Sequence, residues 1–131
     1  MLLVKCPPGG FALDLDSTVF CREGKQAGAR KGRNSHHPLL AVLAEAQFIL
    51  HGWLRSGNTG PARGVIPFLQ EALALLPEGT WLRTVRADSG FFDGNLLDFL
   101  EARALPYVVV ARLTRTLKRK CAGIKDWTVI D

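Results

Sequence analysis

The stretch FALDLDSTVF, residues 11–20, alternates apolar and polar side chains. In an extended chain, Phe11, Leu13 and Leu15 fall on one face, whereas Asp14 and Asp16 fall on the other. The pattern therefore predicts a strand whose first face lies in the core and whose second face bears two carboxylates.

A second acidic motif, VRADSGFFDGN, occupies residues 85–95. Asp88 follows the strand predicted over residues 80–88, at the point where open α/β sheets place their chemistry. If the strands of Asp16 and Asp88 are neighbours, both carboxylates face one crevice, where they repel each other unless a cation lies between them. Such hard oxygen ligands favour Mg²⁺ or Mn²⁺.

The remaining elements follow from periodicity and capping signals. Residues 65–76 have apolar side chains at helical spacing, and we expect the helix to begin near Val65 or to kink at Pro67. Asp93 is the expected N-cap of a second helix over residues 93–104. Residues 106–113 suit a strand buried on both faces, and residues 126–131 the start of another strand. Propensity alone leaves residues 38–60 open between helix and hairpin.

The composition indicates one globular domain. The chain has 131 residues and is 47% hydrophobic, and no apolar run approaches the roughly 20 residues of a membrane span. The apolar start is too short for a secretory signal. The odd and widely spaced cysteines, Cys6, Cys21 and Cys121, are typical of reduced thiols. We therefore expect a cytoplasmic protein with no membrane partner.

Positive charge is concentrated in two segments. Residues 22–37 hold five basic residues against one acidic residue, and residues 112–125 hold six against none, although the whole chain carries only +5. The rest of the chain is therefore acidic. Two basic segments around an acidic body are expected of a protein that holds a polyanion, although solvated loops without a partner would give the same charge pattern.

Two kinds of phosphoryl chemistry fit the acidic motifs. The sequence DLDST suits the nucleophile loop of a haloacid-dehalogenase-like phosphatase, but no lysine lies between Lys31 and Lys118 to steady an aspartyl-phosphate. The alternative is two-metal phosphoryl transfer on DNA, in which carboxylates hold the ions and basic segments bind phosphates. We favour the second interpretation.

Several motifs in order carry a family resemblance. DLDSTVF, HHPLLAVLAEA, LHGWLRSGNTG, RTVRADSGFFD and LPYVVVARLT together resemble the DDE transposases of bacterial insertion sequences. The closest branch has its first acid in an Asp-x-Asp-Ser-Thr strand and its second in Arg-Ala-Asp-Ser-Gly-Phe. The resemblance covers most of residues 11–114.

The resemblance implies an α/β fold with a ribonuclease-H-like, retroviral-integrase-like core. Such a core has a three-stranded antiparallel meander followed by helix, strand, helix and strand. It implies a hairpin with strands near residues 38–44 and 48–55, joined around Glu45 to Gln47. Asp16 matches the first catalytic acid and Asp88 the second, and both would bind Mg²⁺ or Mn²⁺. Asp14 is a further candidate ligand or outer partner. Asn58 and Thr59 match a turn.

The family's third acid, a glutamate on a later helix, has no counterpart in a matching context. We therefore expect a truncated piece of a transposase, with residues 1–10 as a remnant, 11–114 as a partial core and 115–131 as a basic tail entering an absent insertion. DNA nicking and strand transfer would then be lost in the isolated chain. A DNA-binding remnant without catalysis is the main alternative.

The expected partner is double-stranded DNA, at transposon ends and at a target, which implies association with the nucleoid. The candidate DNA contacts are Arg30, Lys31, Arg33, Arg86, Arg115, Lys118, Arg119 and Lys120. A second copy or an intact transposase is a further expected partner. For the other noted residues we expect ordinary roles: core positions for Trp53, Trp81 and Trp127, a solvated loop for His36 and His37, and a strand surface for His51.

Overall fold

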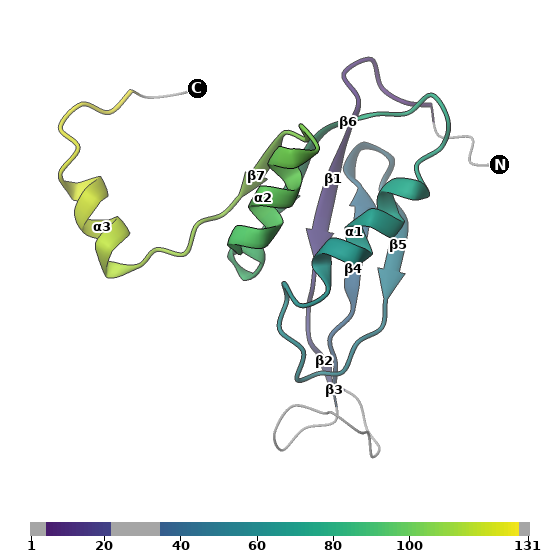
Figure 1. The fold of residues 1–131 in the computed structure, drawn as a ribbon, viewed down its shortest axis with the longest axis horizontal. Coiled ribbons are helices and arrows are strands. Elements are labelled where there is room, and N and C mark those ends of the chain that lie inside the picture. The colour runs from purple at the N-terminus through teal and green to yellow at the C-terminus, as the bar shows by residue number, and fades with distance from the viewer. Residues whose placement is uncertain (1–4, 22–34, 129–131) are drawn as a thin grey trace.

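The computed structural model describes residues 5–21 and 35–128 of the chain. Its centre is a five-stranded sheet with the order β5-β4-β1-β6-β7, and two helices, α1 and α2, cover one face of it (Figure 1). The sheet strands are β1 (Phe11–Asp16), β4 (Leu39–Leu43), β5 (Phe48–Trp53), β6 (Leu82–Ala87) and β7 (Tyr107–Val109). A separate two-stranded sheet consists of β2 (Phe20–Cys21) and β3 (Ser35–His36).

Strand β1 lies in the middle of the sheet and has the two different faces that its alternating pattern predicts. It pairs antiparallel with β4 and parallel with β6. Phe11, Leu13 and Leu15 are buried against the helices, whereas Asp14 is half-buried and Asp16 is exposed on the opposite face. The two acids therefore lie on the face that the helices leave open.

The ambiguous segment is a hairpin, as the family resemblance implies. Strands β4 and β5 are antiparallel and are joined by a 3₁₀ turn, η1 (Ala44–Ala46). Gln47 closes the turn in the left-handed conformation, with φ of 49°. Leu39, Ala41 and Leu43 are fully buried at alternate positions, so burial of one strand face overrides the local helix propensity.

Helix α1 (Val65–Ala74) begins at its predicted residue and continues past Pro67. Pro67 is the third residue of the helix, where its missing N–H would have no helical acceptor in any case. Helix α2 (Gly94–Ala102) has Asp93 as N-cap, with the carboxylate accepting the N–H groups of Asn95 and Leu96 at 3.1 and 3.4 Å. Both starting points are as predicted.

The last predicted strands need correction. Strand β7 has three residues, forms one edge of the sheet, and leaves the side chain of Val108 63% exposed, so it is not buried on both faces. The reason is that no described helix covers the face to which Val108 points. Residues 126–128 form no strand, and 129–131 lie outside the described residues.

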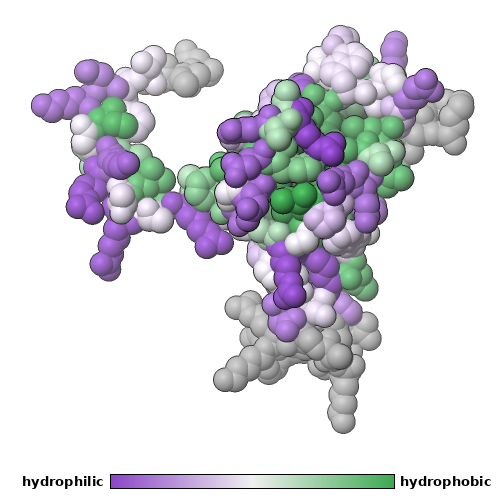
Figure 2. Space-filling model, in the orientation of Figure 1, coloured by the Kyte–Doolittle hydropathy of each residue, from purple (hydrophilic) through white to green (hydrophobic). Residues whose placement is uncertain are grey.

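The basic segment contains a helix that we did not predict. Helix α3 (Arg115–Ala122) is capped by Thr114, whose hydroxyl accepts the N–H of Leu117 at 3.2 Å. It stands apart from the sheet on an extended segment, and its side chains are mainly hydrophilic (Figures 1 and 2). None of the helices in the described ranges is long and apolar enough to cross a membrane.

Candidate active site

Asp16 and Asp88 lie at the same edge of the sheet, the one formed by the carboxyl ends of β1 and β6. Strands β1 and β6 run parallel with Leu15 opposite Ala87, and each acid is the next residue in its chain. The carboxyl ends of parallel strands meet at one edge, which is where open α/β sheets bind ligands. The two motifs, 72 residues apart in sequence, are therefore brought together by strand pairing.

Neither acid is neutralised by a cation in the described structure. From the described residues, Asp16 Oδ1 accepts one long hydrogen bond, of 3.4 Å, donated by the Thr18 hydroxyl. Asp88 caps the 3₁₀ turn η2 (Ser89–Phe91), and its Oδ1 accepts the N–H of Gly90 at 2.7 Å. Both carboxylates keep further lone pairs for a ligand.

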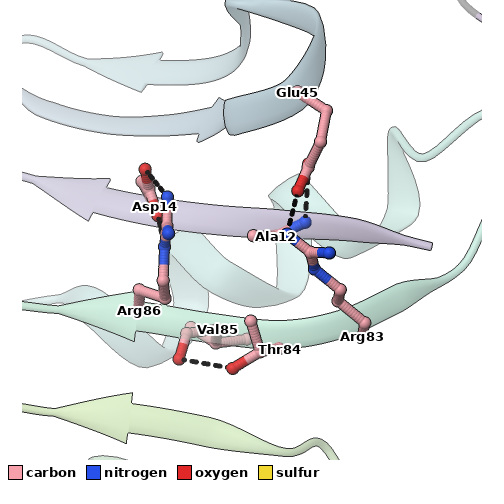
Figure 3. A network of polar contacts seen from close by, with 7 residues as sticks. All are labelled: Ala12, Asp14, Glu45, Arg83, Thr84, Val85 and Arg86. Carbon is pink, nitrogen blue, oxygen red and sulfur yellow. Dashed lines mark hydrogen bonds and ion pairs between the residues drawn. The ribbon is translucent and has the colours of Figure 1, made fainter. Parts of the chain in front are cut away.

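Asp14 is engaged differently from Asp16. Arg86 on β6 lies directly opposite it and donates two hydrogen bonds, from Nε to Oδ1 at 2.6 Å and from Nη2 to Oδ2 at 2.7 Å (Figure 3). The hydrogen bond to Asp14 raises the pKa of Arg86 above its usual value. Because Arg86 already compensates its charge, Asp14 is a weaker candidate for a metal ligand than Asp16 or Asp88.

A shallow groove runs from the Asp14 and Arg86 pair to Asp88. Its volume is about 370 Å³, and it is lined by Asp14, Leu15, Arg86, Ala87, Asp88, Val108 and Val110. The exposed valines of the β7 region form its apolar side. The groove is open and combines acidic, basic and apolar surfaces, which suits an extended ligand better than a small enclosed one.

Glu45 connects the hairpin turn to β1 and β6. Its Oε2 accepts the backbone N–H of Ala12 at 2.9 Å, and its Oε1 is ion-paired with Arg83 (Figure 3). Ala12 is fully buried although it lies on the polar face of β1. The Ala12 N–H is the main cause that lowers the pKa of Glu45, with a smaller contribution from Arg83.

Replacing Glu45 with Gln should lower the melting temperature at neutral pH by roughly 2–4 °C, because the neutral amide loses the charge-assisted contacts. A carboxyl with a lowered pKa stabilises the fold above its unfolded pKa and loses that contribution as the pH falls through the folded value. The two proteins should therefore converge in acid, as thermal melts between pH 3 and 7 would show. The exposed Glu78→Gln variant serves as control; a constant difference at all pH values would contradict this account.

Sequence reasoning missed a polar cluster beside Asp16. His37 was expected in a solvated loop, but its side chain is only 5% exposed, and Nε2 lies 3.2 Å from the Ser17 carbonyl while Nδ1 contacts the Thr59 carbonyl. Arg55, just after β5, donates to the Ser17 hydroxyl at 2.6 Å. A lone arginine between a strand and a glycine-rich turn gives no pattern, so nothing in the sequence singled it out.

Other sequence predictions for single residues have mixed outcomes. Trp53 packs against the core, whereas Trp81 and Trp127 are 49% and 67% exposed, so the core prediction is wrong for these two. His51 is on β5 as expected, but it also contacts Glu71 at 2.8 Å. Cys6 and Cys121 are free thiols.

The predicted DNA contacts divide into three groups. Arg30, Lys31 and Arg33 lie outside the described residues. Arg86 is paired with Asp14 in the groove. Exposed side chains on α3 make up the third group: Arg115, Lys118, Arg119 and Lys120.

The donor set at the sheet edge fits a divalent cation. The carboxylates of Asp16 and Asp88, which form no ion pair with any described residue, supply hard oxygen ligands of the kind that Mg²⁺ and Mn²⁺ prefer. Over residues 5–21 and 35–128, no group of three or more His, Cys, Asp or Glu side chains is close enough to hold a metal. The described residues therefore suit an open site with two protein ligands.

The architecture defines a class of protein. A mixed sheet with an antiparallel hairpin beside β1, parallel β6 and β7, and two acids at one edge is a ribonuclease-H-like catalytic core. The sequence model of the family described as "Transposase DDE domain group 1" matches residues 4–129. The chain belongs to this transposase family, and its fold is the one that the sequence resemblance implied.

Solved structures show the same fold at low sequence identity. The magnesium-bound catalytic core of HTLV-2 integrase in its dimeric form aligns with a TM-score of 0.54 and 14% identity, over 88% of this chain and 66% of the integrase chain. The piggyBac transposase synaptic complex with hairpin DNA aligns with a TM-score of 0.55 and 13% identity, over 91% of this chain and 27% of that chain. The chain thus spans less than two thirds of these proteins. No curated protein sequence matches.

Proposed function

We propose that this chain is the catalytic core of a transposase from a bacterial insertion sequence, acting on the strands of double-stranded DNA. Membership of the DDE transposase family supports a role in DNA transposition. The observation that supports catalysis is the placement of Asp16 and Asp88 at the ends of adjacent parallel strands, where no described residue forms an ion pair with either acid.

Asp16 and Asp88 would hold Mg²⁺ or Mn²⁺ between their carboxylates. A bound divalent ion would supply Lewis-acid activation of the attacking hydroxyl and stabilise charge on the phosphate. The Gly90 N–H holds Oδ1 of Asp88, and the charge of Arg86 makes Asp14 a weaker competitor for a cation. The groove beside Asp88 would receive the DNA backbone.

The isolated chain is proposed to be a poor nuclease. Within the described residues no group of three or more acidic, His or Cys side chains is close enough to hold a metal, whereas two-metal chemistry needs more ligands than two carboxylates to fix both ions. Weak metal binding with little strand cleavage is the expected behaviour. Full activity would require a further carboxylate, either from residues outside the described ranges or from an intact transposase that associates with this chain.

The exposed cations of α3 are the proposed DNA contacts of the described structure. Each phosphate that a lysine or arginine neutralises releases counterions, which gives affinity without sequence specificity. Binding of this kind supports a cytoplasmic, nucleoid-associated protein. Partnership with a second copy is a further proposal, supported by the dimeric form of the similar integrase core and by the synaptic complex of the similar transposase.

Mn²⁺ binding tests the proposed site. Titration of the protein followed by electron paramagnetic resonance should show one weak site, and Asp16→Asn or Asp88→Asn should weaken it at least about tenfold because half of the protein ligands are lost. Asp98→Asn, on α2, is the control and should leave the affinity unchanged. Binding that persists in the double variant Asp16→Asn/Asp88→Asn would contradict the proposal.

Two alternatives make different predictions. A DNA-binding remnant without a metal site would bind duplex DNA but show no Mn²⁺ signal that depends on Asp16. A phosphatase would turn over a small phosphate ester and lose this activity on Asp14→Ala. The pairing of Asp14 with Arg86 argues against a nucleophilic role for Asp14, since two charge-assisted hydrogen bonds withdraw electron density from its carboxylate.

A further inference from the structure

Arg55 joins three segments of the chain. Its Nε donates to the carbonyl of His37 at 3.0 Å, its Nη2 to the hydroxyl of Ser17 at 2.6 Å, and its Nη1 approaches three carbonyls of the loop before α1. Those three acceptors are Gly60 at 3.3 Å, Pro61 at 3.1 Å and Arg63 at 2.7 Å. Within the described ranges, no carboxylate forms an ion pair with Arg55. Arg55 therefore uses its donors mainly to hold backbone carbonyls of neighbouring segments in place.

The first link leads from Arg55 to Asp16. Ser17 directly follows Asp16, and its hydroxyl accepts from Arg55 while donating to the Pro38 carbonyl at 3.0 Å. The Ser17 carbonyl in turn lies 3.2 Å from Nε2 of the buried His37. The residue after Asp16 is thus held through both its side chain and its backbone, which fixes the direction in which β1 ends.

The second link leads from Arg55 to Asp88. Arg55 holds the carbonyl of Pro61, and the Pro61 ring packs so closely on Gly90 that an added Cβ there would lie 3.0 Å from Cγ of Pro61. The same Cβ would lie 2.9 Å from Oδ1 of Asp88, the atom that accepts the Gly90 N–H. Gly90 is therefore confined between the loop that Arg55 holds and the second acid.

We propose that Arg55 is a positioning residue that fixes the separation of Asp16 and Asp88, through Ser17 on one side and through Pro61 and Gly90 on the other. This inference rests on the proposed metal site and adds a residue that touches neither the metal nor DNA. Arginine suits the task because its planar fork of five donors can serve several carbonyls at once and remains charged. Burial lowers the pKa of Arg55, and arginine side chains remain charged in proteins.

The test is Mn²⁺ affinity, measured by electron paramagnetic resonance, together with the melting temperature. Arg55→Gln should weaken Mn²⁺ binding about tenfold, the lower end of the effect of losing a group that orients metal ligands. Arg55→Lys keeps the charge but loses the fork, so it should recover only part of the affinity. Arg83→Gln is the matched control, because Arg83 also bonds across the sheet but contacts Glu45 rather than either acidic motif. The Mn²⁺ affinity of the Arg83→Gln variant should stay within about twofold of that of the unsubstituted protein.

A smaller change protects the test against unfolding. If Arg55→Gln shows no cooperative melting, Ser17→Ala removes a single link to Asp16 and Ser17→Thr retains the hydroxyl; only the alanine variant should bind Mn²⁺ more weakly. Folded Arg55→Gln or Ser17→Ala protein with unchanged Mn²⁺ affinity would overturn the role of Arg55 alone. Absence of any Asp16-dependent Mn²⁺ binding in the original chain would instead overturn the proposed metal site, and this inference with it.

Discussion

Phe68→Ala should destabilise the protein by about 3–5 kcal/mol, enough to unfold a domain of marginal stability. Phe68 is fully buried on α1 and joins the helix to β5. Its ring stacks on His51 at a centroid distance of 4.9 Å and meets Trp53 edge-on at 5.4 Å. Truncation would remove these aromatic contacts and leave a cavity beneath the helix that the rigid sheet cannot fill.

Urea unfolding followed by circular dichroism measures this change. The control is Phe20→Ala, because Phe20 is 58% exposed and its loss should cost well under half as much. Since His51 and Trp53 also bond to Glu71 of the same helix, both at 2.8 Å, the apolar contact and the polar contacts share one interface. Similar losses for the two phenylalanine variants would show that α1 is not docked on β5 through Phe68.

The core could be predicted from sequence because it is encoded by local patterns. The alternation in β1 and the helical spacing after Val65 each mark one apolar face, and in the structure these are the faces that are buried. Residues 38–55 could not be assigned by propensity, since their leucines and alanines fit helix and buried strand alike. Only the family resemblance identified the hairpin. Strand β7 was predicted too long and buried on both faces, because an apolar run does not reveal whether its second face is covered.

The site was predictable in part for the same reason. Asp16 and Asp88 stand in motifs at strand ends, and the parallel pairing of β1 with β6 places them at one edge as expected. The contacts of Arg55 and the burial of His37 depend on loops that meet only in the fold. Asp14 illustrates the limit in another way: alternation placed it on the face of Asp16, but pairing register alone brings Arg86 opposite it.

Neutralising the α3 cations should weaken binding to duplex DNA on the order of a thousandfold at 0.1 M salt. For B-DNA, a plot of log affinity against log salt concentration has a slope of about −0.9 for each phosphate contact. Four contacts give a slope of about −3.6, and at 0.1 M salt, one decade below 1 M, they contribute roughly 3.6 decades of affinity. The variant replaces Arg115, Lys118, Arg119 and Lys120 with Gln, all of them exposed. Glutamine retains helix propensity, so α3 should persist. Fluorescence anisotropy with a labelled duplex at 50–300 mM salt gives both the affinity and the slope.

The salt slope separates a specific DNA surface from a simple effect of net charge. A control that replaces Lys5, Arg83 and Arg103 with Gln also removes positive charge, but these residues are dispersed over the body of the protein. If DNA binds to α3, the slope of log affinity against log salt concentration should become shallower by about 3 to 4 in the helix variant. In the control it should change by less than about 1. Equal reductions in the two variants would mean that α3 is a solvated basic segment and that DNA is held elsewhere. A large reduction for α3 with unchanged Mn²⁺ affinity would show that DNA capture and metal binding occupy separate surfaces of one core.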